Sequence, residues 1–214
     1  MSVITDEERI ESIRRWWQEN GVAVAVGLVL GVGLLVGWRL WSGHTENQVL
    51  QASERYEALR YAAAQSDPDP AMEQARALAE EFNGTPYATL ADLMLSRLAV
   101  EQGDLETGEH RLRRVMETAP HEDMAQLARL RLARVLLADD RPREALTLLE
   151  SEMPEAYLAL ARELQGDAYL ALDRETDART AYDEAVMAAA QPSDYLMMKR
   201  DALGNAVPAG QEAP

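Results

Sequence analysis

Residues 21–38 form an uncharged apolar run, GVAVAVGLVLGVGLLVGW, and this run most restricts the environment in which the chain can fold. As a helix rising 1.5 Å per residue it spans roughly 27 Å, close to the ~30 Å hydrocarbon core of a bilayer. Tryptophans, which favour the lipid headgroup level, flank it on both sides: Trp16, Trp17, Trp38 and Trp41. The pattern predicts a transmembrane helix over residues 21–41, preceded by a short N-terminal arm of residues 1–20.

Two other interpretations of the run fit less well. A cleaved signal peptide has a shorter apolar core and small residues at its cleavage site, whereas the bulky residues 38–41 follow this run. A nucleotide-binding turn would extend Gly31-x-Gly33 to a third glycine, but that position is Val36. It would also need an acidic residue about 20 positions later, after a strand–helix pattern. An uncleaved membrane anchor remains the prediction.

Four glycines in the run are spaced as a helix–helix contact requires. Gly27 and Gly31 are four residues apart, as are Gly33 and Gly37. Small residues at this spacing let a second membrane helix approach closely. Glycine is also generally frequent in membrane helices, and the sequence leaves both explanations open.

The arginines around the run give a weak indication of orientation. Three lie on the N-terminal side and two within about 20 residues on the C-terminal side: Arg9, Arg14, Arg15, Arg39 and Arg55. This bias favours a cytoplasmic N-terminus and a C-terminal domain across the membrane. The absence of cysteine is compatible with that side and excludes disulfides, thiolate nucleophiles and Cys-ligated metals.

Residues 45–206 have the pattern of successive helices. Apolar residues recur every three to four positions, and no stretch alternates strictly enough for a strand. Turn-forming clusters rich in Pro, Gly, Asn and Asp interrupt the pattern at residues 67–70, 83–86, 102–104, 119–120, 139–142, 153–154 and 191–192. We predict helix pairs near 45–82, 86–118, 121–152 and 155–190, a last helix near 193–204, and a flexible tail at 207–214.

The helix pairs repeat in sequence. Segments 90–108, 127–145 and 160–178 align without gaps, and the last unit has the spacing of a tetratricopeptide repeat at Gly166, Tyr169, Ala178, Tyr182 and Ala185. The small residue lets the two helices touch, and the aromatic residues fill the gaps. Such pairs bury a core only by stacking. We therefore predict an all-α fold: an N-terminal transmembrane helix followed by a tetratricopeptide-repeat-like α-solenoid.

Composition and motifs give no support for catalysis. The net charge of −16 disfavours binding to nucleic acid. No nucleophile elbow, zinc-protease or phosphate-loop motif occurs, and the histidines His44, His110 and His121 share no metal-ligand spacing. We expect no catalytic residues, no cofactor, no metal site and no small-molecule substrate.

A protein-binding groove remains as the candidate site. Counting along the aligned units places Arg97, Arg134, Glu163 and Asp167 on the first helix of successive pairs, at positions that face the groove of such a solenoid. The arginines are suited to a carboxylate or carbonyl of a bound chain. Ion pairing with acidic residues inside the domain is the alternative use.

Several motifs carry a resemblance to a known family. They are Asn20-Gly21, Ala25-Val26-Gly27, Leu30-Gly31-Val32-Gly33, Gly37-Trp38-Arg39 and Trp41 in the anchor, with LRLARV at 130–135 and LQGDA at 164–168. In these the chain resembles the YfgM family, ancillary subunits of the bacterial SecYEG protein-conducting channel. The arm at residues 1–20 departs most from the family.

The resemblance implies a single-span inner-membrane protein with a periplasmic helical domain. It implies association with SecYEG and with the membrane-anchored periplasmic chaperone PpiD, so that exported polypeptides pass into the chaperone network. It implies no catalytic residues. Two alternatives remain: a tethered scaffold for envelope assembly or cell division, and a stress-response regulator that acts through residues 1–20.

Overall fold

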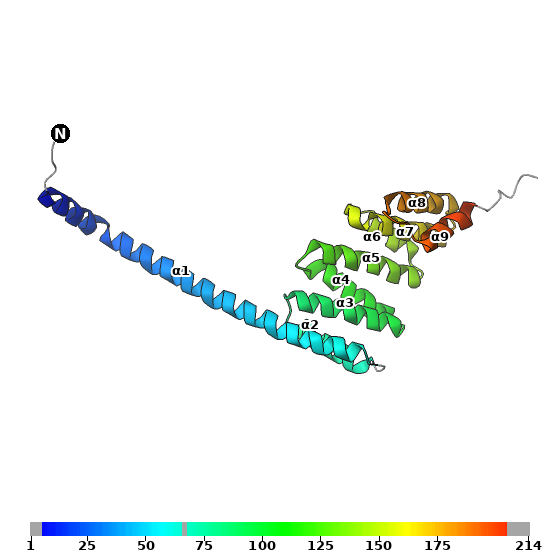
Figure 1. The fold of residues 1–214 in the computed structure, drawn as a ribbon, viewed down its shortest axis with the longest axis horizontal. Helices are drawn as coiled ribbons and strands as arrows, with labels where there is room; N and C mark the ends of the chain where they lie inside the picture. The colour runs from blue at the N-terminus through cyan, green and yellow to red at the C-terminus, as the bar shows by residue number, and fades with distance from the viewer. Residues whose placement is uncertain (1–5, 66–67, 205–214) are drawn as a thin grey trace, which may run out of the picture. The chain divides into compact units, whose positions relative to one another are not determined.

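The computed structural model describes residues 6–65 and 68–204 of the chain. These residues form nine α-helices (Figure 1). The helices are α1 (Asp6–Ala63), α2 (Asp69–Glu81), α3 (Pro86–Glu101), α4 (Leu105–Thr118), α5 (Glu122–Ala138), α6 (Pro142–Leu149), α7 (Glu155–Ala171), α8 (Glu175–Ala188) and α9 (Asp194–Gly204). The chain divides into two units after Leu50.

The first unit contains the apolar part of α1. Large apolar side chains along this part are exposed, among them Val22, Leu34 and Trp38. Among the described residues α1 alone is long and apolar enough to cross a membrane, judged by length and composition. An apolar helix whose described side chains are exposed suits a lipid environment, as expected of an anchor.

The helix α1 continues through the predicted end of the span to Ala63. Residues 44–63 contain neither proline nor glycine, so no residue interrupts the helical hydrogen bonds. Its last part belongs to the second unit, where Ala52 and Leu59 are completely buried. These side chains share a core cluster with residues of α2 and α3, including Leu78 and Leu95. The last part of α1 therefore serves as the first helix of the first repeat pair.

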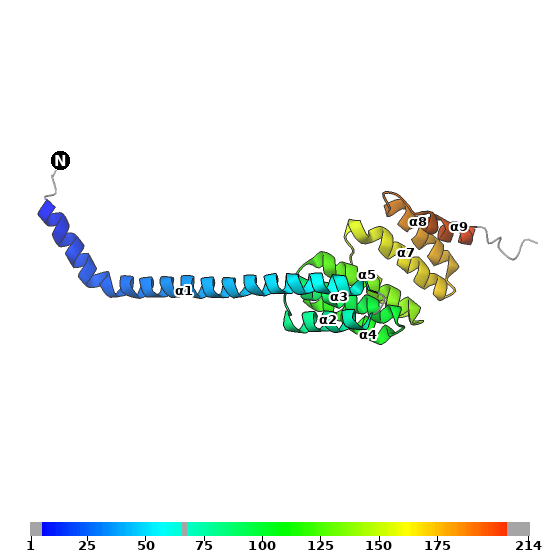
Figure 2. The ribbon, with the colours of Figure 1, turned by 60° about the horizontal axis from the view of Figure 1, so that its bottom comes forward.

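The second unit is a stack of helix pairs. The last part of α1 shares a core with α2. The pairs α3–α4, α5–α6 and α7–α8 follow, and α9 packs on α8. The first helices of successive pairs are neighbours, because α5 contacts both α3 and α7 (Figure 2). The predicted all-α class, with a long apolar helix followed by tetratricopeptide-like repeats, is confirmed.

The turn inside each of the last three pairs has a common geometry. Gly103, Asp140 and Asp173 have φ values of 83°, 56° and 57°, in the left-handed region. This conformation directs the next backbone N–H to a carbonyl five residues back. The bonds run from Asp104 to Ala99 at 2.9 Å, Arg141 to Leu136 at 2.8 Å, and Arg174 to Tyr169 at 2.9 Å. Each first helix thus closes its C-terminus in the same way before the second begins.

Candidate functional site

A hollow of about 340 Å³ lies over the first helices of the second and third pairs. Its apolar lining comes from Val100 of α3, Leu112 of α4 and Val135 of α5. Polar residues of the same helices complete the lining: Ser96, Arg97, Glu101, Arg131 and Arg134. The hollow therefore combines an aliphatic surface with three guanidinium groups, in a chain whose net charge is −16.

The three arginines differ in exposure. Arg97 is about half exposed, Arg134 is exposed, and Arg131 is partly buried. Arg97 Nε lies 3.8 Å from Glu101 Oε1, and both side chains are more than half exposed. Such an exposed pair contributes little. Among the described residues, neither Arg131 nor Arg134 makes an ion pair or a side-chain hydrogen bond.

The surroundings of Arg131 change the pKa of its side chain. Burial lowers the pKa of its guanidinium, and the neighbouring charges of Arg134 and Arg97 lower it further. An arginine remains charged in spite of such a shift. The three charges therefore repel one another in a partly desolvated place, which favours an anion beside them.

The acidic residues predicted for the groove have a different environment. Lys199 of α9 places its Nζ 2.9 Å from Glu163 Oε1 and 2.8 Å from both carboxylate oxygens of Asp167 on α7. The hydroxyl of Tyr182 donates to Asp167 Oδ1 at 2.7 Å. Glu163 and Asp167 are thus mostly buried under α9 and already paired within the domain. Local sequence did not reveal this, because Lys199 is more than 30 residues away.

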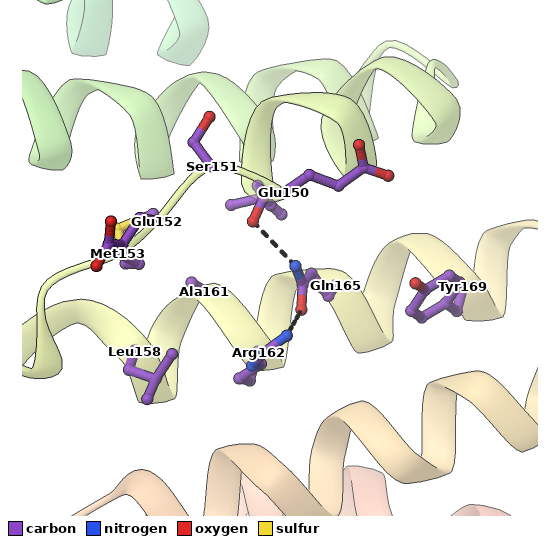
Figure 3. A pocket seen from close by; sticks show the side chains of 10 residues that line it. Glu150, Ser151, Glu152, Met153, Leu158, Ala161, Arg162, Gln165 and Tyr169 are labelled. Carbon is purple, nitrogen blue, oxygen red and sulfur yellow. Dashed lines mark hydrogen bonds between the residues drawn. The ribbon is translucent and has the colours of Figure 1, made fainter.

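A second cavity, of about 430 Å³, lies between α7 and the segment that follows α6 (Figure 3). Gln165 reaches across it and donates from Nε2 to the carbonyl of Leu149 at 3.0 Å. Its Oε1 accepts from Arg162 Nη1 at 2.8 Å, and Arg162 Nε also lies 3.1 Å from Glu184 Oε2. Gln165 thus connects α7 to the end of α6, and Arg162 connects it to α8. Because these polar groups already have partners within the domain, the cavity is not the stronger binding candidate.

The four glycines of the apolar run face open space. A Cβ built on Gly27, Gly31, Gly33 or Gly37 meets no other group of the described residues within 4 Å. At 3.6 residues per turn, the pair Gly27 and Gly31 lies roughly 120° around the helix from the pair Gly33 and Gly37. The glycines therefore form two separate strips, and one neighbouring helix would contact one of them.

Metal binding receives no support where the structure is defined. Among the described residues, no group of three or more His, Asp or Glu side chains is arranged to hold a metal ion. The side chain of His44 lies outside the described part.

Sequence reasoning missed Arg131. It precedes Arg134 by three residues, which places both on one side of α5. That spacing was the available signal. The count along the aligned units named Arg134 in this helix and did not use that spacing.

Comparisons with known proteins agree with this architecture. The family model described as a tetratricopeptide repeat-like domain matches residues 14–205. An ancillary SecYEG translocon subunit of Escherichia coli is 34% identical over 130 residues, covering 61% of this chain and 62% of that protein. The protein of the same description from Haemophilus influenzae is 31% identical over 132 residues, covering 62% and 64%. The chain thus spans less than two thirds of the length of either relative in these matches.

A solved structure supports the fold alone. The MamA 41-end structure from Desulfovibrio magneticus RS-1 matches with a TM-score of 0.56 at 17% identity, over 72% of this chain and 89% of that one. The similarity to ancillary translocon subunits that the sequence motifs predicted is also confirmed. Because the family model covers most of its length, the chain belongs to the tetratricopeptide repeat-like domain family.

Proposed function

We propose that the protein is a non-enzymatic, membrane-anchored adaptor of the SecYEG translocon that binds polypeptides through its helical repeats. The main supporting observation concerns α1. This single helix contains the exposed apolar segment, and its last part also serves as the first helix of the repeat stack. Similarity to ancillary SecYEG translocon subunits supports the channel as the place of action.

The proposed mechanism is an increase in effective concentration. A binding surface tethered by one membrane helix stays close to the channel, so that a weak contact with a partner there becomes intramolecular in effect. Repeat stacks suit this task, because they present an extended surface built from neighbouring helices. No chemical step is required of the domain.

The finer proposal concerns topology and partner. The N-terminal arm lies in the cytoplasm, the span crosses the bacterial inner membrane, and the repeat domain lies in the periplasm. The excess of arginine on the N-terminal side of the run supports this orientation. The resemblance to the YfgM family supports PpiD as the chaperone partner to which exported chains are passed.

Purification of the tagged full-length protein from membranes in mild detergent, followed by mass spectrometry, tests the proposal. Recovery of channel subunits together with a periplasmic chaperone is the expected result. Recovery of cell-wall or division proteins without channel subunits would contradict it and favour the tethered scaffold.

Replacement of the span provides the control. Residues 21–41 are exchanged for an unrelated apolar helix of equal length, and the repeats are left unchanged. If the natural span docks on the channel, the channel subunits are lost from the purified material while the protein stays in the membrane. A scaffold that needs only a tether would retain its partners.

A further inference from the structure

The lining of the hollow between α3 and α5 carries more positive than negative charge. Three other partly buried arginines of the domain have acidic partners. Arg111 Nη1 and Arg114 Nε lie 3.2 and 3.3 Å from the Asp92 carboxylate, and Arg141 Nη1 lies 2.6 Å from Glu109 Oε2. In contrast, partly buried Arg131 has no acidic partner among the described residues and has two further guanidiniums as neighbours.

The surroundings of the arginines restrict the kind of anion. The aliphatic side chains of Val100, Leu112 and Val135 line the same hollow, so an apolar group gains from contact beside the charge. A long polyanion is disfavoured by the overall charge of −16 and by Glu101, which also lines the hollow. A single carboxylate next to an apolar side chain satisfies both conditions.

The position of the hollow favours an acidic side chain over a chain terminus. It lies over α3 and α5, which have further repeat helices on both sides, and α5 contacts α7 beyond it (Figure 1). A segment lying across these first helices passes the hollow in the middle of its course. The residue delivered there belongs to the interior of the segment.

We propose that Arg97, Arg131 and Arg134 form a subsite for an Asp or Glu side chain, flanked by an aliphatic residue, in a polypeptide bound across the first helices. This inference rests on the proposed adaptor function and specifies the chemistry of what the repeats bind. Guanidinium groups hold carboxylates through two parallel hydrogen bonds, which gives the subsite selectivity for an anion over an amide.

Fluorescence anisotropy with the detergent-solubilised full chain provides the test. The probe is the labelled peptide Ser-Ala-Leu-Glu-Val-Ala-Ser with both ends blocked. One comparison peptide carries Gln in place of Glu, and a second carries Gln and a free C-terminal carboxylate. At low salt the Glu peptide is expected to bind about tenfold more tightly than either comparison peptide, as a charged hydrogen bond provides.

Variants identify the site. Arg131→Met keeps the aliphatic stem, and it should reduce binding of the Glu peptide to the level of the Gln peptide, as should Arg134→Gln. The matched control is Arg129→Met, since Arg129 is a partly exposed arginine of the same helix that lines a different depression, with Arg113 and Glu144. Arg129→Met should leave binding of the Glu peptide unchanged. Circular dichroism checks that each variant remains folded.

Several outcomes would overturn the inference. They are equal binding of the Glu and Gln peptides, preference for the free C-terminus, an equal loss with Arg129→Met, and no binding of any peptide at millimolar concentration. Recovery of channel subunits with the wild-type protein, combined with any of these, would leave the adaptor function intact. Glu-selective binding without channel subunits would preserve the subsite and reject the location at the translocon.

Discussion

The ring of Tyr182 on α8 lies directly against the backbone of Gly166 on α7. A Cβ built at Gly166 would overlap the ring carbons of Tyr182, whose side chain is almost completely buried. Glycine is required here by the close approach of two helices, since α7 is regular at this point. The contact sets the distance between the two helices of the last pair.

Replacing Gly166 with Ala should destabilise the repeat domain by about 1–3 kcal/mol, the usual cost of overpacking a core. Urea unfolding followed by circular dichroism measures the change. Combining Gly166→Ala with Tyr182→Leu should recover part of the loss, because the smaller side chain vacates the space. Gly204→Ala is the control, since among the described residues a Cβ there meets only Arg179 Nη2, at 3.9 Å. A similar loss in the control would argue against the packing explanation.

Much of the fold was predictable because its signals are local. Proline, glycine and aspartate clusters lie where helices end, and the spacing of Gly166 and Tyr182 indicates a close helix pair. The uninterrupted α1 also has a local signal, the absence of proline and glycine from residues 44–63, which the division into span and domain did not use.

The candidate site was less predictable, because it depends on contacts between distant segments. The pairing of Lys199 with Glu163 and Asp167 joins α9 to α7, and no periodicity within a helix predicts it. The hollow at Arg97 and Arg134 requires the packing of α5 on α3. A repeat alignment ranks positions along one helix but does not show which of them an added helix covers.

Asp92 provides a test of a buried ionic network. Its carboxylate on α3 lies between Arg111 and Arg114 of α4, and Arg114 Nη2 also donates to the carbonyl of Ala79 on α2 at 2.7 Å. Asp92→Asn would leave two guanidiniums with no countercharge. The expected loss is about 3 kcal/mol of unfolding free energy, as for other broken buried pairs.

The matched control for Asp92 is an exposed pair. Arg60 Nη1 lies 3.1 Å from Glu57 Oε1, and both side chains are about two thirds exposed. Glu57→Gln should change the unfolding free energy by less than about 0.5 kcal/mol. Equal effects of Asp92→Asn and Glu57→Gln in urea unfolding would show that burial does not decide the strength of these pairs.

Lys199 should make the domain sensitive to alkaline pH. Burial alone lowers the pKa of its ammonium, but the hydrogen bonds that it donates to Asp167 and Glu163 raise the pKa above the ordinary value. A cation whose pKa is higher in the folded state stabilises fully below the unfolded value of about 10.4 and loses that contribution as pH rises through the folded value. Stability should therefore fall above about pH 10.4.

Because Lys199 is the single lysine of the chain, its titration can be followed directly. Lysine labelled with ¹³C at Cε gives one side-chain resonance, whose midpoint should lie above that of the urea-unfolded protein. Lys199→Met should lower stability at neutral pH and reduce the alkaline loss. Burial and the hydrogen bond to Asp167 also raise the pKa of Tyr182, so part of the loss should persist in this variant. A midpoint at or below the unfolded value would contradict the pairing.

The two glycine strips of the apolar run should differ in their effect on membrane partners. Gly27 and Gly31 lie roughly 120° around α1 from Gly33 and Gly37, so that one neighbouring helix contacts one strip. Leucine at both positions of the contacting strip should keep the neighbour at a distance. We expect its co-purification to fall about tenfold, the factor that corresponds to about 1.4 kcal/mol of binding free energy. Leucine in the other strip should have little effect.

Gly43→Leu is the control for this comparison, because Gly43 lies in the same helix with open space around it and belongs to neither strip. Quantitative mass spectrometry of the purified material gives the readout, and circular dichroism confirms that the repeats remain folded in each variant. Unchanged co-purification with both strips replaced would show that the glycines do not mediate docking. An equal loss from both double variants would indicate two neighbours around the span, since the strips face directions too far apart for one helix to cover.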